Sequence, residues 1–402
     1  MNHVTTWIVV PSYWTFPSGE PGAELTVFDH PTPLDEEGTL VRTLQSFVNL
    51  DGDFHVLVVA ACSNPVLGAQ TRQRVEQLIS PLAADLSLFL VAPPDVERMN
   101  PLLAEPILSL TSYGNIRNVQ LLVPYAAGAE VEIGIDDDEV IEDPTYVHKA
   151  LEFTGREHKG EVVAGMAGPY YDREGEFRLE GAEALVRYGN VFIMKNYYMN
   201  EALKGVLAEP GPEPIVKSNV AFGGNMTVAR DTIARTCHDP YIPRGEDYDF
   251  VINAAMRKLW FYTRPDMGIV HLPPDSTGSQ AADKLSKMLA DIRRFIYMRE
   301  KDRYHREQFP EEAIPMDYLL PYPGAYLEEG MDLRRLGVEA LDTLYPRYRE
   351  EHSPEAFVAE ALETAKVKAA EFFAYREKWE RVLADPDLTD KLAEEIERLR
   401  VR

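Results

Sequence analysis

Short apolar runs alternate with amphipathic segments over the first two-thirds of the chain, and this order limits the possible folds more than any other feature of the sequence. The runs have the length and composition of buried strands, whereas the segments between them carry apolar residues at helical spacing. Strands that alternate with helices favour a mainly parallel, Rossmann-like sheet with helices on its faces. The predicted strands are residues 7–11, 55–61, 86–91, 131–135, 162–167, 191–194, 260–263 and 268–272, and the predicted helices between the earlier strands are residues 35–48, 70–82 and 119–125.

The character of the sequence changes after residue 274, where strand-like runs give way to charged helical segments. A helix is predicted over residues 283–303. Another begins at Ser353-Pro354, because serine is a good N-cap and proline fits the first helical turn. The sequence therefore predicts an α/β domain, residues 1–275, followed by a mostly helical C-terminal region, residues 276–402.

An apolar stripe runs along the helix that begins at Pro354, from Val358 to Leu383, and is interrupted at Arg376. Such a stripe needs a partner surface, because an isolated helix gains little stability by itself. Two interpretations stay open. The helix packs on its own domain, or it forms the seam of a homodimer.

The balance of charge and the cysteine content exclude several classes of function. The 402 residues include 41 Lys and Arg against 66 Asp and Glu, which gives a formal net charge of −25. A chain this acidic is not expected to bind nucleic acid, which requires a basic surface. The sequence shows no apolar run of about eighteen residues and no secretory signal, which predicts a cytoplasmic protein without a membrane span. Two cysteines, Cys62 and Cys237, are too few for a disulfide framework.

Three consecutive aspartates, residues 136–138, directly follow the predicted strand at residues 131–135. In open α/β sheets, ligands bind beyond the carboxyl ends of the strands. Carboxylates two residues apart at such a point can bind one divalent cation, which in turn can bind a diphosphate. A polar turn is the alternative interpretation. A second acidic triplet, residues 35–37, lies on an amphipathic helix, where exposure to solvent explains it.

Three segments occur in the order of the motifs of a known enzyme family. They are Val10-Pro11-Ser12-Tyr13, Gly114-Asn115-Ile116-Arg117-Asn118 and Asp136-x-Asp138. They resemble the first strand and loop, the segment near the donor diphosphate and the DxD motif of nucleotide-sugar glycosyltransferases of the GT-A fold. The resemblance runs from about residue 6 to 274 and is closest to the large family 2 group. It implies that Asp136 faces the donor ribose and the metal, and that Asp138 binds Mn²⁺ or Mg²⁺.

Two later segments extend the resemblance. Gly223-Gly224-Asn225 is similar to the glycine-rich segment before the acceptor site, where small residues let the backbone approach a sugar. Gly245-Glu246-Asp247 is similar to the Glu-Asp motif of inverting members, which implies that Asp247 is the general base for the acceptor hydroxyl. The residues by themselves leave simpler alternatives open: a turn at the glycines, and capping of a helix over residues 248–258 by the two acids.

His271 ends the last predicted strand. In several GT-A enzymes a histidine at this place is the third protein ligand of the metal, and neutral imidazole suits Mn²⁺. The resemblance thus implies a metal site of Asp136, Asp138 and His271, although a lone histidine is more often structural or exposed. The donor-binding residues that the resemblance implies are Pro11, Ser12, Tyr13, Arg117, Asn118, Asp136, Asp137, Gly224, Asn225 and Glu246.

The resemblance implies a metal-dependent hexosyltransferase that moves a sugar, with inversion, from a nucleoside-diphosphate sugar to a hydroxyl of a soluble small-molecule or glycan acceptor. A retaining GT-A synthase of a glycerate-type compatible solute is the first alternative, because such enzymes also carry a helical C-terminal extension. A nucleotidyltransferase and a non-catalytic sugar-binding scaffold are alternatives from other classes. One departure leaves the donor base open: the second strand ends Cys62-Ser63-Asn64, without the aspartate that reads the base in many family 2 members.

Overall fold

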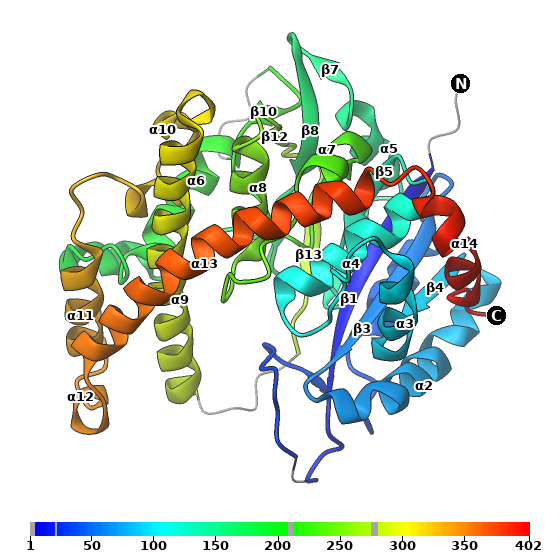
Figure 1. Cartoon of the computed structure of the whole chain (residues 1–402), viewed down its shortest axis with the longest axis horizontal. Helices are drawn as coiled ribbons and strands as arrows, with labels where there is room; N and C mark the ends of the chain where they lie inside the picture. The colour runs from blue at the N-terminus through cyan, green and yellow to red at the C-terminus, as the bar shows by residue number, and fades with distance from the viewer. Residues whose placement is uncertain (1–4, 21, 208–211, 275–279) are drawn as a thin grey trace.

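The centre of the molecule is a ten-stranded sheet with helices on both faces (Figure 1). The computed structural model describes residues 5–20, 22–207, 212–274 and 280–402. The main strand order is β10-β12-β8-β11-β5-β1-β3-β4, and β2 and β7 pair with β1 and β8. Strands β5, β1, β3 and β4 run parallel, as do β8 and β12, and antiparallel β11 joins the two groups. The predicted α/β fold with a mainly parallel sheet and a helical C-terminal region is confirmed.

The elements have the following bounds. The strands are β1 (Thr6–Thr15), β2 (Thr32–Pro33), β3 (His55–Cys62), β4 (Leu88–Val91), β5 (Val131–Gly134), β6 (Glu139–Val140), β7 (Glu157–His158), β8 (Glu161–Ala167), β9 (Tyr170–Tyr171), β10 (Val216–Lys217), β11 (Met226–Ala229), β12 (Trp260–Thr263) and β13 (Ile269–His271). The helices are α1 (Leu40–Phe47), α2 (Gly68–Ile79), α3 (Pro93–Met99), α4 (Tyr113–Ala126), α5 (Tyr146–Phe153), α6 (Lys195–Leu207), α7 (Arg230–Arg235), α8 (Glu246–Ala255), α9 (Gln280–Gln308), α10 (Met316–Leu319), α11 (Leu333–Leu344), α12 (Tyr348–Glu351), α13 (Pro354–Leu383) and α14 (Leu388–Arg398). Strands β6, β13 and β9 form a separate three-stranded sheet.

Alternate residues of β1 enter two different hydrophobic cores. Trp7 and Val9 pack into the core that includes α3, α4, α8 and α13, whereas Ile8 and Val10 pack into the core that includes α1, α2 and α5. This division follows from the period of two residues in a strand. Because both faces are covered, the central strands are mostly apolar, as parallel strands in α/β proteins usually are.

Strand β1 continues to Thr15, beyond its predicted end at Pro11, because β3 pairs with it from Trp7 to Trp14. Proline removes a backbone donor and is normally excluded from the middle of a sheet. Here it is tolerated because β5, on the other side of β1, pairs only as far as Val9.

Three other predictions need correction. Helix α1 begins at Leu40 rather than at residue 35, so the second acidic triplet, residues 35–37, lies before the helix and not on it. Residues 191–194 are not a strand but a turn that leads into α6, since the side-chain oxygen of Asn190 accepts the backbone N–H of Phe192 at 3.0 Å and starts a helical turn. Helix α4 begins at Tyr113 rather than at residue 119, because Ser112 caps it by accepting the N–H of Asn115 at 3.3 Å. The Gly-x-x-Arg-Asn segment therefore lies inside the helix and not before it.

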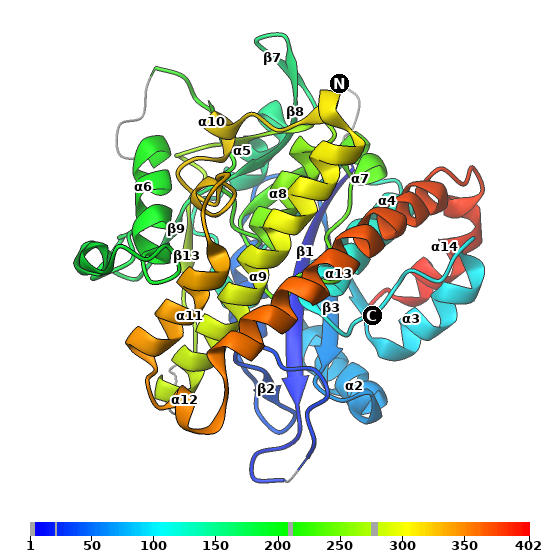
Figure 2. The ribbon, with the colours of Figure 1, turned by 60° about the vertical axis from the view of Figure 1, so that its left-hand side comes forward.

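Helices α9 and α13 lie across the face of the sheet that α4 and α8 cover (Figure 2). The apolar stripe of α13 packs against α9, α11 and α7 of the same chain, which confirms the first interpretation of the stripe. Arg376 does not interrupt the buried face but belongs to it. It is 2% exposed, and its guanidinium lies 4.8 Å from the centre of the Phe373 ring. The indole N–H of Trp379 donates to the carbonyl of Ile233 at 2.8 Å and ties α13 to α7.

A buried ion-pair network joins α9 to α8. Lys301 Nζ lies 2.5 Å from Asp249 Oδ1 and 2.9 Å from Asp239 Oδ2. Lys301 and both aspartates are at most 1% exposed. The hydroxyl of Tyr297 also donates to Asp239 at 2.6 Å. The C-terminal region thus holds the helix that begins with Glu246 and Asp247.

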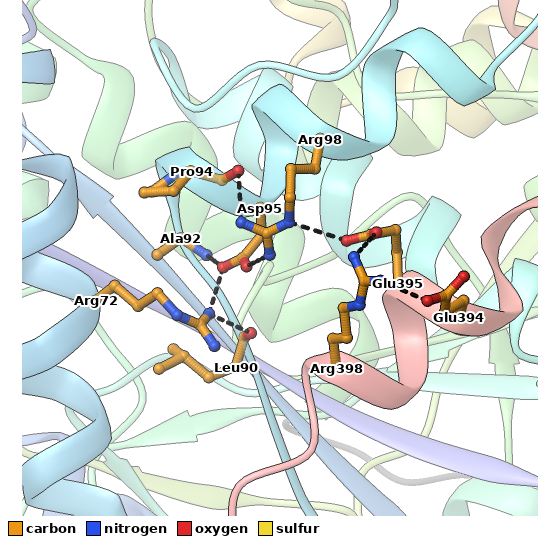
Figure 3. A network of polar contacts seen from close by, with 9 residues as sticks. All are labelled: Arg72, Leu90, Ala92, Pro94, Asp95, Arg98, Glu394, Glu395 and Arg398. Carbon is orange, nitrogen blue, oxygen red and sulfur yellow. Dashed lines mark hydrogen bonds and ion pairs between the residues drawn. The ribbon is translucent and has the colours of Figure 1, made fainter.

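A second network attaches α14 to α3 (Figure 3). Asp95, fully buried at the start of α3, accepts hydrogen bonds from Arg72 at 2.5 Å and from Arg98. Nε of Arg98 also donates a hydrogen bond to Glu395 of α14 at 3.0 Å. Glu395 in turn accepts a hydrogen bond from Arg398 at 2.6 Å. The chain then pairs with the outer side of β4, where the N–H of Leu90 donates to Leu399 and that of Val401 to Leu88, both at 2.9 Å. None of the described helices combines the length and the hydropathy that a membrane span requires.

Candidate active site

The acidic residues 136–138 lie just beyond the carboxyl end of β5, as the sequence predicts. The turn between β5 and β6 is closed by Glu139, whose Oε2 accepts the backbone N–H of Asp136 at 2.7 Å. Thr43 of α1 donates to the carbonyl of Asp137 at 2.9 Å. The three aspartates are half-buried, and Glu139 is fully buried. This turn is therefore fixed by side chains and not a solvated loop.

Arg117 connects the aspartates to the start of α8. It projects from α4, is 6% exposed, and places Nη2 2.6 Å from Asp136 Oδ1 and Nε 3.4 Å from Glu246 Oε1. A guanidinium can bind two carboxylates at once because its donors form a planar fork. Arg117, Asp136 and Glu246, which lie far apart in the sequence, thus meet in one place.

Asp247 lies in the first turn of α8, next to Glu246. The chain enters this helix through Gly245, whose φ of 67° favours glycine. Asp247 Oδ2 accepts the backbone N–H of Gly223 at 3.3 Å. A Cβ atom on Gly223 would lie 2.8 Å from Arg117 Nη2 and 3.3 Å from the Cβ of Asp247. A larger residue at position 223 would therefore displace the guanidinium of Arg117 from its place beside Asp136.

His271 faces Asp138 from the neighbouring strand β13. Its Nε2 lies 3.2 Å from Asp138 Oδ2, and the backbone N–H of Leu272 donates to the carbonyl of Asp138 at 2.8 Å. The His271 ring stacks on Tyr170, with centroids 5.7 Å apart, and Tyr170 stacks on Phe222. Burial lowers the pKa of His271, but the carboxylate of Asp138 more than offsets this, so the net shift of the pKa is upward.

The metal-binding potential of the site rests first on Asp138 and His271. The third predicted ligand, Asp136, is paired with Arg117. Within the described residues, no three side chains of His, Cys, Asp or Glu converge closely enough to hold a metal ion without further ligands. Mg²⁺ sites with one or two carboxylates are commonly completed by substrate phosphates and water. The residues present therefore fit a metal ion that binds together with a diphosphate.

Burial dominates the electrostatics of the carboxylates. It raises the pKa of Asp136, against the opposing effect of Arg117, and raises the pKa of Asp137 to about 8. It also raises the pKa of Glu246 to about 7, and the neighbouring charge of Asp247 adds to the increase. Carboxylates kept close together against their mutual repulsion are typical of sites that bind cations or transfer protons.

Two residues predicted to bind the donor have their side chains engaged within the protein. The amide of Asn118 donates to the carbonyl of His238 at 2.9 Å and accepts its N–H at 2.8 Å. The amide of Asn225 donates to the carbonyls of Pro169 and Met267 at 3.0 and 2.8 Å. Both asparagines hold the loops around the site together, and a contact with the donor stays a prediction for each. Gly224 donates its N–H to the hydroxyl of Tyr170 at 2.7 Å.

Pro11, Ser12 and Tyr13 lie in β1, at the edge of the sheet where residues 136–138 leave β5. Ser12 is buried, and the ring of Tyr13 packs against Phe28 and Tyr113, with centroids 4.8 and 5.3 Å apart. The aromatic group joins β1, the loop after it and α4.

The end of β3, where many family 2 enzymes carry a base-reading aspartate, is covered by the loop that follows β1. The carbonyl of Ser63 accepts the N–H groups of Leu25 and Thr26, both at 2.9 Å. The side chain of Asn64 donates to the carbonyl of Ala23 at 2.8 Å and accepts the N–H of Val66 at 3.0 Å. These polar groups of Ser63 and Asn64 are occupied by the chain itself.

Glu139 and Tyr170 also belong to the site, although the sequence motifs do not include them. Glu139 is not among the predicted site residues. The run of four consecutive acids that it forms with the aspartate triplet was the feature of the sequence that could have indicated it. The hydroxyl of Tyr170 accepts the N–H of Gly224, and its ring stacks on those of Phe222 and His271. Its role depends on the pairing of β9 with β13, for which the sequence shows no pattern.

No family model and no curated protein matches the chain. A mannosyltransferase from Pyrobaculum calidifontis, solved with GDP-Man and Mn²⁺, is 13% identical, with a TM-score of 0.45 over 98% of this chain and 87% of that one. A glucosyl-3-phosphoglycerate synthase from Mycobacterium tuberculosis, solved with Mn²⁺, UDP and phosphoglyceric acid, is 14% identical, with a TM-score of 0.39 over 78% of this chain and 80% of that one. These solved structures are glycosyltransferases. Their identities and TM-scores are low, so the function proposed below rests on the residues of this chain.

Proposed function

We propose that the protein is a metal-dependent glycosyltransferase of the GT-A type, which moves a sugar from a nucleoside-diphosphate sugar to a hydroxyl of a soluble acceptor. One observation carries this proposal: Arg117 brings Asp136, at the carboxyl end of β5, together with Glu246, whose chain neighbour is Asp247. The ligand-binding edge of the sheet and a candidate general base thus belong to one site.

Asp138 and His271 are the residues that would hold Mn²⁺ or Mg²⁺ together with the donor diphosphate. The two side chains lie 3.2 Å apart, and an oxygen and a nitrogen ligand suit Mn²⁺. When bound, the metal supplies positive charge that stabilises the departing nucleoside diphosphate. Arg117 holds Asp136 in place, and Glu139 fixes the turn on which these carboxylates lie.

Asp247 would accept the proton of the acceptor hydroxyl as that oxygen attacks the anomeric carbon, with inversion. A general base must have a fixed orientation, and the backbone N–H of Gly223 holds one carboxylate oxygen of Asp247. The backbone N–H of Tyr248 holds the other oxygen at 2.8 Å, and the side chain is only half-buried. The anomeric configuration of the first product, read by proton NMR, tests inversion against retention.

The direct test of the function is a panel of nucleotide sugars, measured by thermal shift and by donor hydrolysis with and without Mn²⁺. We expect one donor to stabilise the protein only with the metal and to be hydrolysed slowly. Asp138→Ala should abolish both effects. Glu37→Ala, in the other acidic triplet, is the matched control and should behave as the wild type. Full activity of Asp138→Ala would exclude the metal assignment, and an absence of any metal-dependent donor would exclude the enzyme class.

A further inference from the structure

Three positive side chains gather beside the start of α8, although the chain as a whole carries a net charge of −25. They are Lys195 at the start of α6, Arg244 before α8 and Arg294 in α9. All three face Asp291, whose Oδ2 lies 2.6 Å from Lys195 Nζ and whose Oδ1 lies 3.9 Å from both Arg244 Nε and Arg294 Nη1. One buried carboxylate therefore faces three cations.

Several buried polar atoms of this cluster have no hydrogen-bond partner among the described residues. They include the donors Nε and Nη2 of Arg294 and the hydroxyl groups of Tyr248 and Tyr322, which an anionic group could satisfy. Arg294 is 4% exposed and Asp291 5%. Native proteins rarely leave buried donors unpaired, because each carries a free-energy cost. A group of such atoms beside surplus positive charge is the arrangement expected of a site that is completed by a ligand.

The cluster lies on the Asp247 side of the active site rather than on the Asp136 side. A Cβ atom on Gly245 would lie only 2.2 Å from the guanidinium carbon of Arg294, so Arg294 lies against the turn that starts α8. The donor side has its own guanidinium, Arg117, which is paired with Asp136.

The cluster can be reached from solvent through two of its cations. The side chain of Lys195 is 20% exposed and that of Arg244 is 27% exposed. Asp29, 4.0 Å from Arg244, is 54% exposed and so neutralises it only weakly.

We propose that Lys195, Arg244 and Arg294 form a subsite for an anionic group, a carboxylate or a phosphate, carried by the acceptor. This rests on the proposed function, in which Asp247 receives the proton of the acceptor hydroxyl. The anionic group replaces the missing partners of Arg294 and anchors the acceptor, so that its hydroxyl reaches Asp247. Arginine and lysine together are suited to this task, because arginine fixes the orientation of an oxyanion and lysine adds charge.

Binding of inorganic phosphate tests the subsite without any glycosyl transfer. The titration is done by calorimetry at low ionic strength with EDTA, so that no metal site contributes. We expect the wild type to bind phosphate, and Arg244→Gln and Lys195→Gln each to weaken binding by about 5-fold or more. Arg293→Gln is the matched control, since Arg293 adjoins Arg294 but is 46% exposed and pairs with Glu360. A wild type that does not bind phosphate, or an Arg244→Gln variant that binds it equally well, would overturn the proposal.

Acceptors offered in matched pairs decide which substrate the subsite serves. With the donor found by hydrolysis, glycerol 3-phosphate is compared with glycerol, and glucuronate with glucose. We expect kcat/KM to be about 10-fold or more higher for a charged member, with the preference lost in Arg244→Gln and kept in Arg293→Gln. The proposal is overturned if both members of each pair are used equally well, or if neither member is used. It is also overturned if Arg244→Gln increases only the KM for the nucleotide sugar. If the protein binds phosphate but hydrolyses no nucleotide sugar, the proposed function is refuted and the anion subsite is not.

Discussion

At the scale of single residues, three acids of the candidate site each have a specific partner. Arg117 pairs with Asp136, His271 faces Asp138, and a backbone N–H faces Asp247. A variant that keeps the shape of one acid but removes its charge should therefore separate binding from catalysis.

Asp247→Asn is the sharpest such variant. The amide keeps the size of the side chain, and its oxygen can accept one of the two backbone N–H groups, those of Gly223 and Tyr248, that the carboxylate accepts. The amide cannot take up a proton. We expect metal-dependent binding of the donor to stay within about 2-fold of the wild type, and kcat to fall by about 10²-fold or more. Binding is measured by calorimetry and turnover by release of the nucleoside diphosphate. Transfer by Asp247→Asn at the rate of the wild type would refute the role of the base.

Glu132 gives a prediction about stability and pH. It is 4% exposed in β5, and burial raises its pKa to about 8 from an ordinary value of 4.5, with Arg117 opposing the shift. Between these two pH values the unfolded chain has lost a proton that the folded chain keeps, so this residue lowers stability as the pH rises. Glu132→Gln removes the effect, because the amide stays neutral. We measure the free energy of unfolding in urea at pH 5 and at pH 8. We expect the difference between the variant and the wild type to increase by roughly 2–4 kcal/mol in favour of the variant from pH 5 to pH 8. A difference between the proteins that does not change with pH would contradict this account.

At the scale of elements, the sequence predicts best where a segment is apolar throughout. Strand β12 has its predicted bounds, and β3 differs by one residue, Cys62. Helix α4 was predicted to start late because its first turns carry Asn115, Arg117 and Asn118. These polar side chains are accommodated only by partners from distant parts of the chain. The motifs could be located from the sequence because the spacing of their residues is local. Their contacts could not, because the pairing of Arg117 with Asp136 and Glu246 depends on the completed fold.

The buried contact between α9 and α8 leads to a prediction about Lys301. Lys301→Met fills the same space but leaves Asp239 and Asp249 without their buried counter-charge. We expect a loss of about 3–5 kcal/mol in the free energy of unfolding, measured by urea denaturation. Lys366→Met, which removes an exposed pair with Glu363, is the control and should stay within about 0.5 kcal/mol of the wild type. Equal stability of the two variants would show that the network contributes little.

At the scale of the whole molecule, the α/β part and the C-terminal helices share a continuous hydrophobic core. One cluster of buried residues includes Trp7 of β1, Val228 of β11 and Trp379 of α13. Such a core does not let one part unfold while the other stays intact. The sequence predicts a domain boundary at residue 275, which lies outside the described residues. We propose that this boundary marks a change in composition and does not separate two independently stable units.

Scanning calorimetry tests this expectation. We expect one cooperative transition, with the calorimetric enthalpy equal to the van't Hoff enthalpy. Addition of Mn²⁺ together with the donor should move the whole transition to higher temperature, because the ligands bind only the folded state. Two resolved transitions, only one of which responds to the donor, would show that the C-terminal helices unfold separately.

The pairing of residues 399–401 with β4 has a consequence for biosynthesis. Strand β4 is made about three hundred residues before the segment that covers its outer side. During translation its backbone N–H and C=O groups therefore stay open after the rest of the central sheet has emerged from the ribosome. An open strand edge of this kind can pair with another nascent chain. The ion pair between Arg98 of α3 and Glu395 of α14 holds the last helix beside β4, so that the segment after it can cover this edge.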